Sequence, residues 1–395
     1  MRIEQYDWEE VVYEGKAKIL IPRRELFLRE DGVYEPAWSP VFYNPQAVIG
    51  RDVTTLTLHL WFKNKDFFFV DLLAGTGVRG IRIALETNGY GILNDVDPIA
   101  YKYCVRNVEL NMIGDKLDVF MDEANSLMNS FTFSGIPIDY IDVDPYGSPI
   151  PFIEPVFKPL AKKALLGVSA TDTASLTCSY KKKTLYRYNV ECIETDFDKE
   201  LGLRILLYSI THRGASLCVA VKPLISIYYK HYYRIIFETT RSCIESYRII
   251  NSCRGYLWFC PKSLERGFIK NPEEAYDINC MDNEKPRIAG PLWICSLGNE
   301  NLVQKAYEEA SGLEYISKTT RKILETLIYE YSINNPYIRL DQLYSKYRRN
   351  MIPIKEFIET LRNNGFKASR THMDPRGIKT NATIRNLEEL FNLKN

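Results

Sequence analysis

Acidic residues close four successive apolar runs in the first half of the sequence. Asp71 ends FFFVD (67–71), Asp95 follows GILN, Glu123 follows KLDVFMD, and Asp144 ends DYIDVD. The runs are rich in β-branched and aromatic residues and alternate with segments whose apolar positions recur every three or four residues, which predicts parallel strands joined by helices. Because the carboxyl ends of parallel strands meet at one edge of a sheet, we expect these acids to line one crevice.

The first of these strands runs directly into the glycine-rich turn LLAGTGVRG. Gly75, Gly77 and Gly80 fit the pattern G-x-G-x-x-G, in which glycines allow a tight turn and a close backbone approach to a ligand at a helix N-terminus. Asp71 lies four residues before Gly75. A carboxylate there would repel a pyrophosphate but attract an ammonium or sulfonium group, so the pattern favours S-adenosylmethionine over a dinucleotide.

Two later acids fit the adenosine half of such a ligand. Asp95 lies eighteen residues beyond Gly77, where the second acid of a nucleotide fold binds ribose hydroxyls, and Asp97 is its neighbouring candidate. Glu123 and the backbone of Ala124 could meet the adenine. The alternative for each acid is an ordinary helix N-cap.

The segment DPYGSP (144–149) follows the fourth strand and suits an amino-group nucleophile. Asp144 can accept a hydrogen bond from the amine, and the Pro145 carbonyl can accept another. The Tyr146 ring offers a flat apolar surface on which a base can stack. The alternative interpretation is a simple Pro-Gly turn at a strand end.

The chain is long enough for two domains, with 395 residues of which 46% are hydrophobic and 26% charged. We expect a doubly wound, Rossmann-like α/β domain over residues 1–245, with the last strand (232–239) antiparallel at the sheet edge. A smaller α+β domain of winged-helix-like character follows over residues 246–395. Its predicted elements are helices at 318–332, 339–347 and 354–364 and a turn-rich tail at 365–382.

Charge is distributed unevenly along the chain. The net charge of the whole sequence is +1, but residues 315–395 carry +7 and residues 1–314 carry −6. A basic C-terminal region suggests a polyanionic partner, or else a solvated surface. A second basic stretch, which could hold phosphates or simply solvate a loop, lies at 178–192. The candidate phosphate contacts are Lys181, Lys182, Lys183, Arg187, Arg370, Arg376 and Lys379.

The nine cysteines accompany an N-terminus without a basic and apolar export signal. Reduced thiols and a cytoplasmic location are the simplest interpretation. No apolar run reaches the length of a membrane span, so we expect no membrane association.

At this point the sequence resembles the archaeal form of the tRNA (guanine-26) N2-dimethyltransferase family, from about residue 12 to 380. The motifs that carry the resemblance are EGKAKILIP (14–22), SPVFYNP (39–45) with Arg51-Asp52, the glycine loop, LND (93–95), RNVELN (106–111), EAN (123–125), DVDPYGSP (142–149), ATDTASL (170–176), LGLRIL (201–206) and GPLW (290–293).

The resemblance implies a class I methyltransferase that moves one or two methyl groups from S-adenosylmethionine to the exocyclic amine of a tRNA guanine. Asp144 would be the catalytic acid of a D-P-F/Y motif, with Pro145 beside it. Phe42 and Tyr146 would line the base pocket, where relatives usually carry Phe instead of Tyr. The implied cofactor-binding residues are Arg51, Asp71, Gly75, Gly77, Arg79, Asp95, Glu123 and Ala124.

Many relatives carry two C-x-x-C-like pairs after the catalytic domain, whereas this chain retains only Cys260 and Cys280 with Cys253 nearby. We therefore expect no structural zinc. We infer tRNA as the partner and no obligatory protein partner. The competing interpretations are an NAD-dependent oxidoreductase that uses the same glycine loop and a non-catalytic RNA-binding protein.

Overall fold

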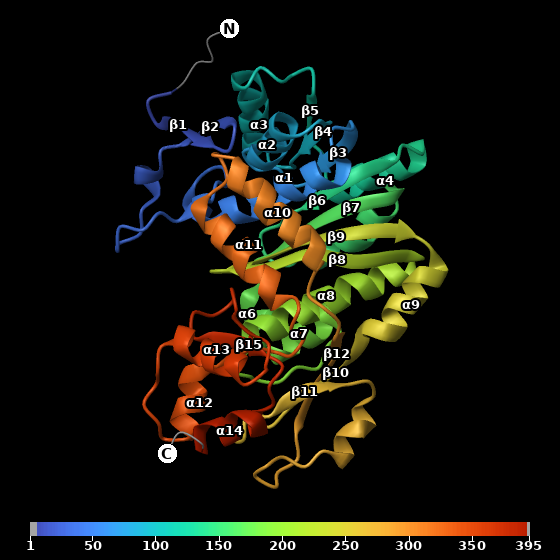
Figure 1. Cartoon of the computed structure of the whole chain (residues 1–395). Coiled ribbons are helices and arrows are strands. Elements are labelled where there is room, and N and C mark those ends of the chain that lie inside the picture. Colours follow the sequence, from blue (N-terminus) through green and yellow to red (C-terminus); the bar gives the residue numbers. More distant parts are fainter. Residues whose placement is uncertain (1–5, 393–395) are drawn as a thin grey trace. The chain divides into compact units, whose positions relative to one another are not determined.

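Figure 1 shows the computed structural model, which describes residues 6–392. Contacts within the chain divide it into two compact units. The first unit holds residues up to Ser169 with Ile236–Arg241 and Lys305–Lys322, and the second unit holds Ala170–Ile235, Ser242–Gln304 and the chain from Ile323 onward. Each unit contains segments from before and after residue 245. The units therefore do not correspond to the domains 1–245 and 246–395, and the division into these two domains stays a prediction.

The main sheet has seven strands in the order β5-β4-β3-β6-β7-β9-β8, and the neighbours from β5 to β7 run parallel. This arrangement confirms the doubly wound α/β prediction. The strands are β3 (Phe67–Asp71), β4 (Gly89–Asn94), β5 (Leu117–Phe120), β6 (Ile138–Val143), β7 (Leu160–Ala170), β8 (Val219–Tyr229) and β9 (Tyr232–Arg241).

The expected position of the last strand is wrong, because β8 forms the edge and β9 lies between β7 and β8. Only residues 230–231 separate the two strands, and so short a connection joins adjacent strands in antiparallel order. Ile235, Ile236 and Phe237 of β9 are fully buried. The hairpin therefore returns an apolar strand to the inside of the sheet.

Local residues fix the ends of helices in the first unit. Asp97 accepts a hydrogen bond from the Ile99 backbone N–H (2.8 Å) ahead of α3, and α4 ends at Gly135, which has a positive φ of 66°. Such caps satisfy backbone groups that the helix cannot pair itself. The helices are α1 (Val48–Phe62), α2 (Val78–Glu86), α3 (Pro98–Leu110), α4 (Ala124–Ser134) and α5 (Ile150–Phe157).

An antiparallel N-terminal hairpin packs on α3 (Figure 1). The Asn107 side chain of α3 both accepts from the Leu20 backbone N–H (2.6 Å) and donates to the Leu20 carbonyl (3.2 Å), as a strand partner would. The hairpin strands are β1 (Glu9–Glu14) and β2 (Ala17–Pro22), followed by 3-10 helices at Arg24–Phe27, Pro36–Trp38 and Pro45–Ala47.

The second unit contains an antiparallel sheet in the order β11-β10-β12. Most of the basic stretch at 178–192 forms the helix α7. The elements are α6 (Thr173–Leu176), α7 (Lys181–Tyr188), α8 (Asp198–Ser216), α9 (Cys243–Cys253), β10 (Arg254–Phe259), β11 (Arg266–Ile269), a 3-10 helix (Pro272–Asp277) and β12 (Arg287–Trp293).

The expectation of reduced thiols is wrong for six of the nine cysteines. The structure contains disulfides between Cys218 and Cys243, Cys253 and Cys295, and Cys260 and Cys280. The partners are 20 to 42 residues apart in sequence, but their Cα atoms lie 4.1–6.0 Å apart. Sequence spacing does not reveal such proximity, since connectivity is set by the fold.

The C-terminal part combines helices with a small sheet in the order β13-β15-β14. The three predicted helices are confirmed, while the turn-rich tail also forms two short strands. The elements from residue 300 onward are α10 (Glu300–Gly312), α11 (Lys318–Glu330), β13 (Ile338–Arg339), α12 (Leu340–Lys346), α13 (Ile354–Asn363), β14 (Ala368–Arg370), β15 (Gly377–Thr380) and α14 (Ile384–Asn392). Across residues 6–392, no helix is both long and apolar enough to span a membrane.

Candidate active site

The strand order reverses between β3 and β6, and this reversal positions the candidate site. β4 and β5 lie on one side of β3, while β7 lies beyond β6. Asp71, the last residue of β3, is opposite Asp142 of β6 in the parallel register, and Asp144 follows just after β6. Ligands of doubly wound sheets bind in the crevice at such a switch point. Three carboxylates therefore meet where a ligand is expected.

The glycine loop has the backbone shape that the sequence predicts. Gly75 and Gly77 have positive φ angles of 57° and 77°, and Gly77 directly precedes α2. A Cβ on Gly77 would come within 2.9 Å of the Leu93 side chain, which would have to shift, and the positive φ would strain any larger residue. Asp95 accepts a hydrogen bond from the Gly75 N–H (2.8 Å). Asp95, which is predicted to bind the ribose, thus also stabilises the conformation of the glycine loop.

The acids that follow β4 and β5 have structural contacts as well as free surface. The second carboxylate oxygen of Asp95 accepts from the Asp97 backbone N–H (3.0 Å). Glu123 accepts from the Ser126 N–H at the start of α4 (2.8 Å), and hydrogen bonds from the Asn125 and Ser126 backbone hold its pKa below the ordinary value. The N-cap alternative is therefore correct for Glu123 and Asp97, and it leaves a cofactor role for Glu123 open.

Two buried polar atoms in the same loops have no hydrogen-bond partner among the described residues: Thr76 Oγ1 in the glycine loop and Asn125 Oδ1 beside Ala124. Buried polar atoms are normally paired, and an unpaired one indicates a missing partner. A nucleoside ligand with hydroxyl and amine groups would provide one, so the loops fit an adenosine-containing cofactor. Sequence reasoning missed both residues, although each lies within a motif that it used.

Arg79 contacts the candidate catalytic acid. Its guanidinium donates to Asp144, lies 3.2 Å from Asp142 through Nε, and lies 3.4 Å from Thr54 Oγ1. Its side chain is 6% exposed and that of Asp144 is 29% exposed. Burial opposes the charge of Arg79, but the Asp142 and Asp144 carboxylates raise its pKa. The structure therefore assigns Arg79 a position that orients Asp144, and the expected contact with the cofactor stays a prediction.

Asp71 lies deeper than the sequence suggests. It is 1% exposed and accepts a hydrogen bond from the Gly80 N–H in the first turn of α2 (3.0 Å). Burial, followed by the charge of Asp142, raises the pKa of Asp71 to about 7. Its expected place in the cofactor pocket stays a prediction, while its contact with α2 is structural.

The raised pKa of Asp71 predicts a pH-dependent stability difference for the variant Asp71→Asn. The folded chain keeps a proton on Asp71 up to about pH 7, whereas the unfolded chain releases it near its ordinary value of 3.8. This carboxyl therefore lowers the free energy of unfolding as pH rises between these values. The variant lacks that loss, so its stability relative to the parent should increase with pH.

Urea midpoints measured between pH 5 and pH 8 would test this expectation. Asp139→Asn is the matched control, because Asp139 also accepts a backbone hydrogen bond, from Phe68 (3.0 Å), but at the opposite end of β6. If the difference between the urea midpoints of the parent and Asp71→Asn stays constant over the whole pH range, Asp71 does not titrate as described.

Arg51 is held by a glutamate that sequence reasoning did not single out. Arg51 donates twice to Glu14 (2.5 Å each) and once to the Asn44 carbonyl (3.0 Å). Burial alone would raise the pKa of Glu14, but the Arg51 and Arg82 guanidinium groups lower it to about 2. Glu14 is the first residue of the EGKAKILIP motif, and this motif was the signal in the sequence that could have identified it. The predicted cofactor contact of Arg51 remains untested.

Two exposed aromatic rings, one of them two residues beyond Asp144, contact each other. Phe42 is 45% and Tyr146 is 81% exposed, and their rings meet edge to face with centroids 6.3 Å apart. Pro145 between Asp144 and Tyr146 is buried, which anchors the turn. The structure thus brings together the residues predicted to hold a base, and large exposed rings of this kind are suited to stacking.

The residues predicted to bind RNA do not form one surface of free cations. Lys182 and Lys183 of α7 are exposed, but Lys181 pairs with Glu194 (3.0 Å) and Arg187 with Asp172 (3.1 Å). Arg370 in the tail is exposed.

Two predicted tail contacts need revision. The Lys379 side chain is 1% exposed and pairs with Glu200 (3.0 Å), so its position does not fit the predicted phosphate contact. Arg376 is exposed but pairs with Asp341 (3.2 Å) and Asp374 (3.5 Å). All four residues of β15 are buried, Lys379 among them, which a count of charges cannot reveal.

Within residues 6–392 no cluster of three or more His, Cys, Asp or Glu side chains is arranged to hold a metal ion. Cys260 and Cys280, the remaining candidates for a zinc site, form a disulfide. The expected absence of structural zinc stays a prediction.

The doubly wound sheet, the glycine loop and the acids at the switch point define an α/β enzyme with a nucleotide-type cofactor site, of the class I methyltransferase kind. The sequence matches the model of the family described as N2,N2-dimethylguanosine tRNA methyltransferase over residues 15–392. The chain therefore belongs to this family.

Individual relatives agree over nearly the whole chain. A tRNA (guanine(26)-N(2))-dimethyltransferase of Sulfolobus acidocaldarius is 34% identical over 383 residues, covering 96% of each chain. One of Pyrococcus horikoshii is 32% identical over 394 residues, covering 94% of this chain and 95% of that protein. The solved structure of Trm1 from Pyrococcus horikoshii with S-adenosyl-L-methionine is similar with a TM-score of 0.82 and 29% identity, covering 96% of this chain and 99% of the other.

Proposed function

We propose that this chain is a tRNA methyltransferase that transfers one or two methyl groups from S-adenosylmethionine to the exocyclic amine of guanosine at position 26. The observation that carries the proposal is the group of Asp144, Phe42 and Tyr146 at the switch point of the sheet, beside the glycine loop. Family membership and the relatives named for this reaction support it.

Several residues of the chain fit the cofactor. Asp95 and Glu123 follow neighbouring strands and would bind the ribose and the adenine side, while Thr76 and Asn125 would gain the hydrogen-bond partners they lack. Bound S-adenosylmethionine supplies an electrophilic methyl group on a positively charged sulfur. The protein must then align the acceptor amine and exclude water, which in model reactions lowers a barrier by up to about 7–11 kcal/mol.

Asp144 would act on the acceptor amine. A guanine amine is a weak nucleophile, because its lone pair is delocalised into the ring. A carboxylate that accepts its hydrogen bond increases its electron density and can take the proton as the new bond forms, which contributes about 10²–10⁴-fold. Arg79 donates to the Asp144 carboxylate and so fixes its direction.

The aromatic rings would hold the base. A guanine in a folded tRNA must leave its stack to reach the site, at a cost of a few kcal/mol. Stacking on an aromatic side chain returns about 1–3 kcal/mol per base. Phe42 and Tyr146 are exposed and adjacent, so they can offset much of that cost.

The direct test is to incubate the protein with labelled S-adenosylmethionine and unmodified tRNA transcripts that carry either G26 or A26. We expect labelled N2-methylguanosine and N2,N2-dimethylguanosine from the G26 transcript alone. Equal labelling of both transcripts would contradict position 26, and absence of transfer would contradict the function. Calorimetry with NAD separates the oxidoreductase alternative, since we expect no binding.

Asp95→Ala should weaken cofactor binding. The substitution removes ribose hydrogen bonds and also releases the Gly75 N–H that Asp95 holds. Hydrogen bonds to charged groups contribute about 1.5–3 kcal/mol, so we expect the dissociation constant to rise roughly 10- to 100-fold, as measured by calorimetry. Asp97→Ala is the comparison, since Asp97 is the neighbouring candidate and caps α3, and we expect it to keep the parent affinity. Equal affinities for the Asp95→Ala variant and the parent would rule out the ribose assignment.

A further inference from the structure

Four positively charged or chargeable side chains of the second unit lie together outside the active site. They are His212 and Arg213 at the end of α8, Arg254 at the start of β10, and Lys270 just after β11. His212, Arg254 and Lys270 are exposed. We call this set the α8–β10 basic surface.

The positive side chains of the α8–β10 basic surface influence one another. Partial burial and the charges of Arg213 and Arg254 lower the pKa of His212. Partial burial and the charge of Arg254 lower the pKa of Lys270. Both shifts have the direction that mutual repulsion between cations produces. The surface therefore has a positive potential that an anion would relieve.

Carbonyl oxygens accept hydrogen bonds from two of these cations. Lys270 donates to the carbonyls of Ser252 (3.0 Å) and Arg254 (2.7 Å). Arg213 donates to the carbonyls of Ser209 (3.0 Å) and Arg187 (3.2 Å). Neither Arg254 nor Lys270 forms an ion pair with any carboxylate in the part of the chain that the structure describes.

Glu274, four residues beyond Lys270, is already engaged. Glu274 accepts hydrogen bonds from the backbone N–H groups of Asn271 (3.0 Å) and Lys270 (3.5 Å). These contacts direct its carboxylate to the start of a 3-10 helix. The Lys270 ammonium keeps carbonyl partners only, which is the state of a cation available to a phosphate.

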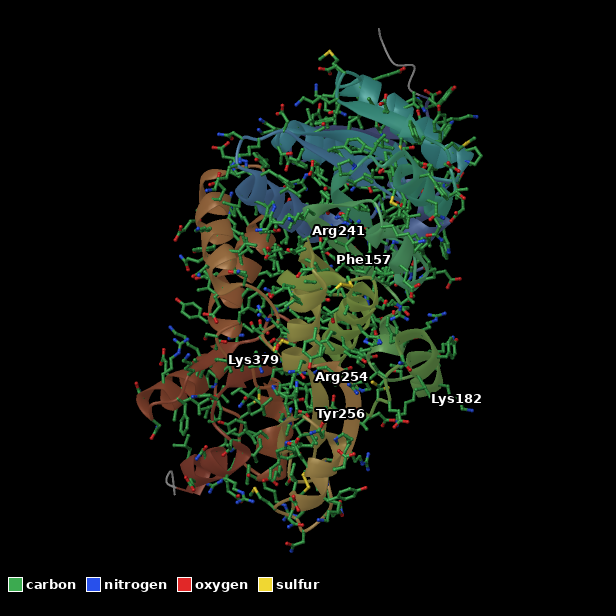
Figure 2. All side chains as sticks on the ribbon, turned by 90° about the vertical axis from the view of Figure 1, so that its right-hand side faces the viewer. Phe157, Lys182, Arg241, Arg254, Tyr256 and Lys379 are labelled. Carbon is green, nitrogen blue, oxygen red and sulfur yellow. A yellow bond between two sulfur atoms is a disulfide. The ribbon has the colours of Figure 1, made fainter. Side chains whose placement is uncertain are left out.

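Aromatic side chains accompany the cations. The Tyr208 and His212 rings stack with centroids 5.5 Å apart on one face of α8, and Tyr256 lies two residues beyond Arg254, on the same face of β10. Figure 2 shows Arg254 and Tyr256 along β10 and Lys182 pointing outward from α7. Cations on rigid elements with aromatic neighbours are suited to a nucleic-acid backbone.

We propose that the α8–β10 basic surface binds backbone phosphates of the tRNA substrate, an inference that rests on the proposed function. It differs from the sequence-based expectation, which assigned this role to the C-terminal tail and to the basic stretch at 178–192. Lys379 in the tail is buried and Arg376 is paired with acids, whereas Arg254 and Lys270 keep their charges unneutralised. Phosphates bound here release counterions and remove the repulsion among the cations.

The test is the double variant Arg254→Ala/Lys270→Ala, compared with Arg248→Ala/Lys262→Ala. The control removes the same two residue types from the same unit, but its cations pair with Glu245 (3.8 Å) and with Glu284. tRNA affinity is measured over a range of salt concentrations. The salt dependence should flatten by about 1.4–1.8 in log–log slope for the test variant, since each phosphate contact contributes roughly 0.7–0.9.

Steady-state kinetics provide a second readout. We expect the KM for tRNA to rise on the order of tenfold in the test variant, with kcat and the KM for S-adenosylmethionine unchanged. The single variant Arg254→Glu should weaken tRNA binding more than Arg254→Ala does. This comparison checks that the effect comes from the charge and not from the loss of a side chain. If the parent methylates G26 but the test and control variants share its salt slope, the surface inference is wrong while the function stands. If the parent transfers no methyl group, the proposed function fails first.

Discussion

Asp144→Ala should abolish methyl transfer while S-adenosylmethionine still binds with nearly the parent affinity. The carboxylate follows β6, two residues before the exposed Tyr146, and Arg79 orients it. Removing it takes away the group that accepts the amine hydrogen bond and the proton, and such assistance contributes about 10²–10⁴-fold. Single-turnover transfer with saturating cofactor measures this loss directly.

A variant that kept more than about a hundredth of the parent rate would exclude general-base or strong hydrogen-bond assistance by Asp144. Asp144→Asn keeps the shape of the side chain but cannot take a proton, so it should be slower than the parent and faster than Asp144→Ala. Glu154→Ala, which removes an exposed carboxylate from the neighbouring helix α5, controls for a general effect of charge and should retain the parent rate.

The strands and the order of the acids along the chain could be predicted from sequence, because each depends on neighbouring residues. β3 and β6 are short apolar runs bounded by acids and turns, and the side chains at their ends follow from the direction of the chain. Gly77 needs a positive φ that glycine adopts without strain. Features that depend on neighbouring residues in this way can be predicted without knowledge of the tertiary structure.

The contacts that sequence reasoning missed are those between residues far apart in the chain. Arg79 finds Asp144 sixty-five positions away, Glu14 finds Arg51 thirty-seven positions away, and Lys379 meets Glu200 across 179 positions. The sequence around a charged residue does not show whether that residue will be buried against a partner far away in the chain. The three disulfides are invisible in the sequence for the same reason.

Arg82→Met should cause the largest loss of stability among the substitutions considered for the first unit. Arg82 is fully buried and donates to Glu14 (3.0 Å), Asp52 (2.6 Å) and Glu86 (2.8 Å). Asp52 in turn accepts hydrogen bonds from Ser317 and Thr320. Removing the guanidinium leaves buried carboxylates without their shared cation, and breaking a buried pair in this way costs about 3–5 kcal/mol.

The pH dependence of this loss distinguishes unpaired charge from lost packing. Glu14 has a pKa of about 2 in the folded chain, against an ordinary value of 4.5. Its stabilising contribution is present above 4.5 and disappears as pH falls toward 2. The variant lacks part of this contribution, so the difference in the free energy of unfolding between parent and variant should be largest near neutral pH and should shrink in acid. A difference that stays constant from pH 7 to pH 3 would indicate a cavity instead.

Arg24→Met is the matched control for the buried pair, because Arg24 pairs with Glu10 (2.9 Å) while its side chain is 42% exposed. Exposed ion pairs contribute about 0–1 kcal/mol, so the denaturant midpoint of this variant should be close to that of the parent.

Glu14 also holds Arg51, and loss of Arg82 should therefore weaken S-adenosylmethionine binding if Arg51 contacts the cofactor. Unchanged cofactor affinity in a folded Arg82→Met variant would separate the buried ion network from the cofactor site.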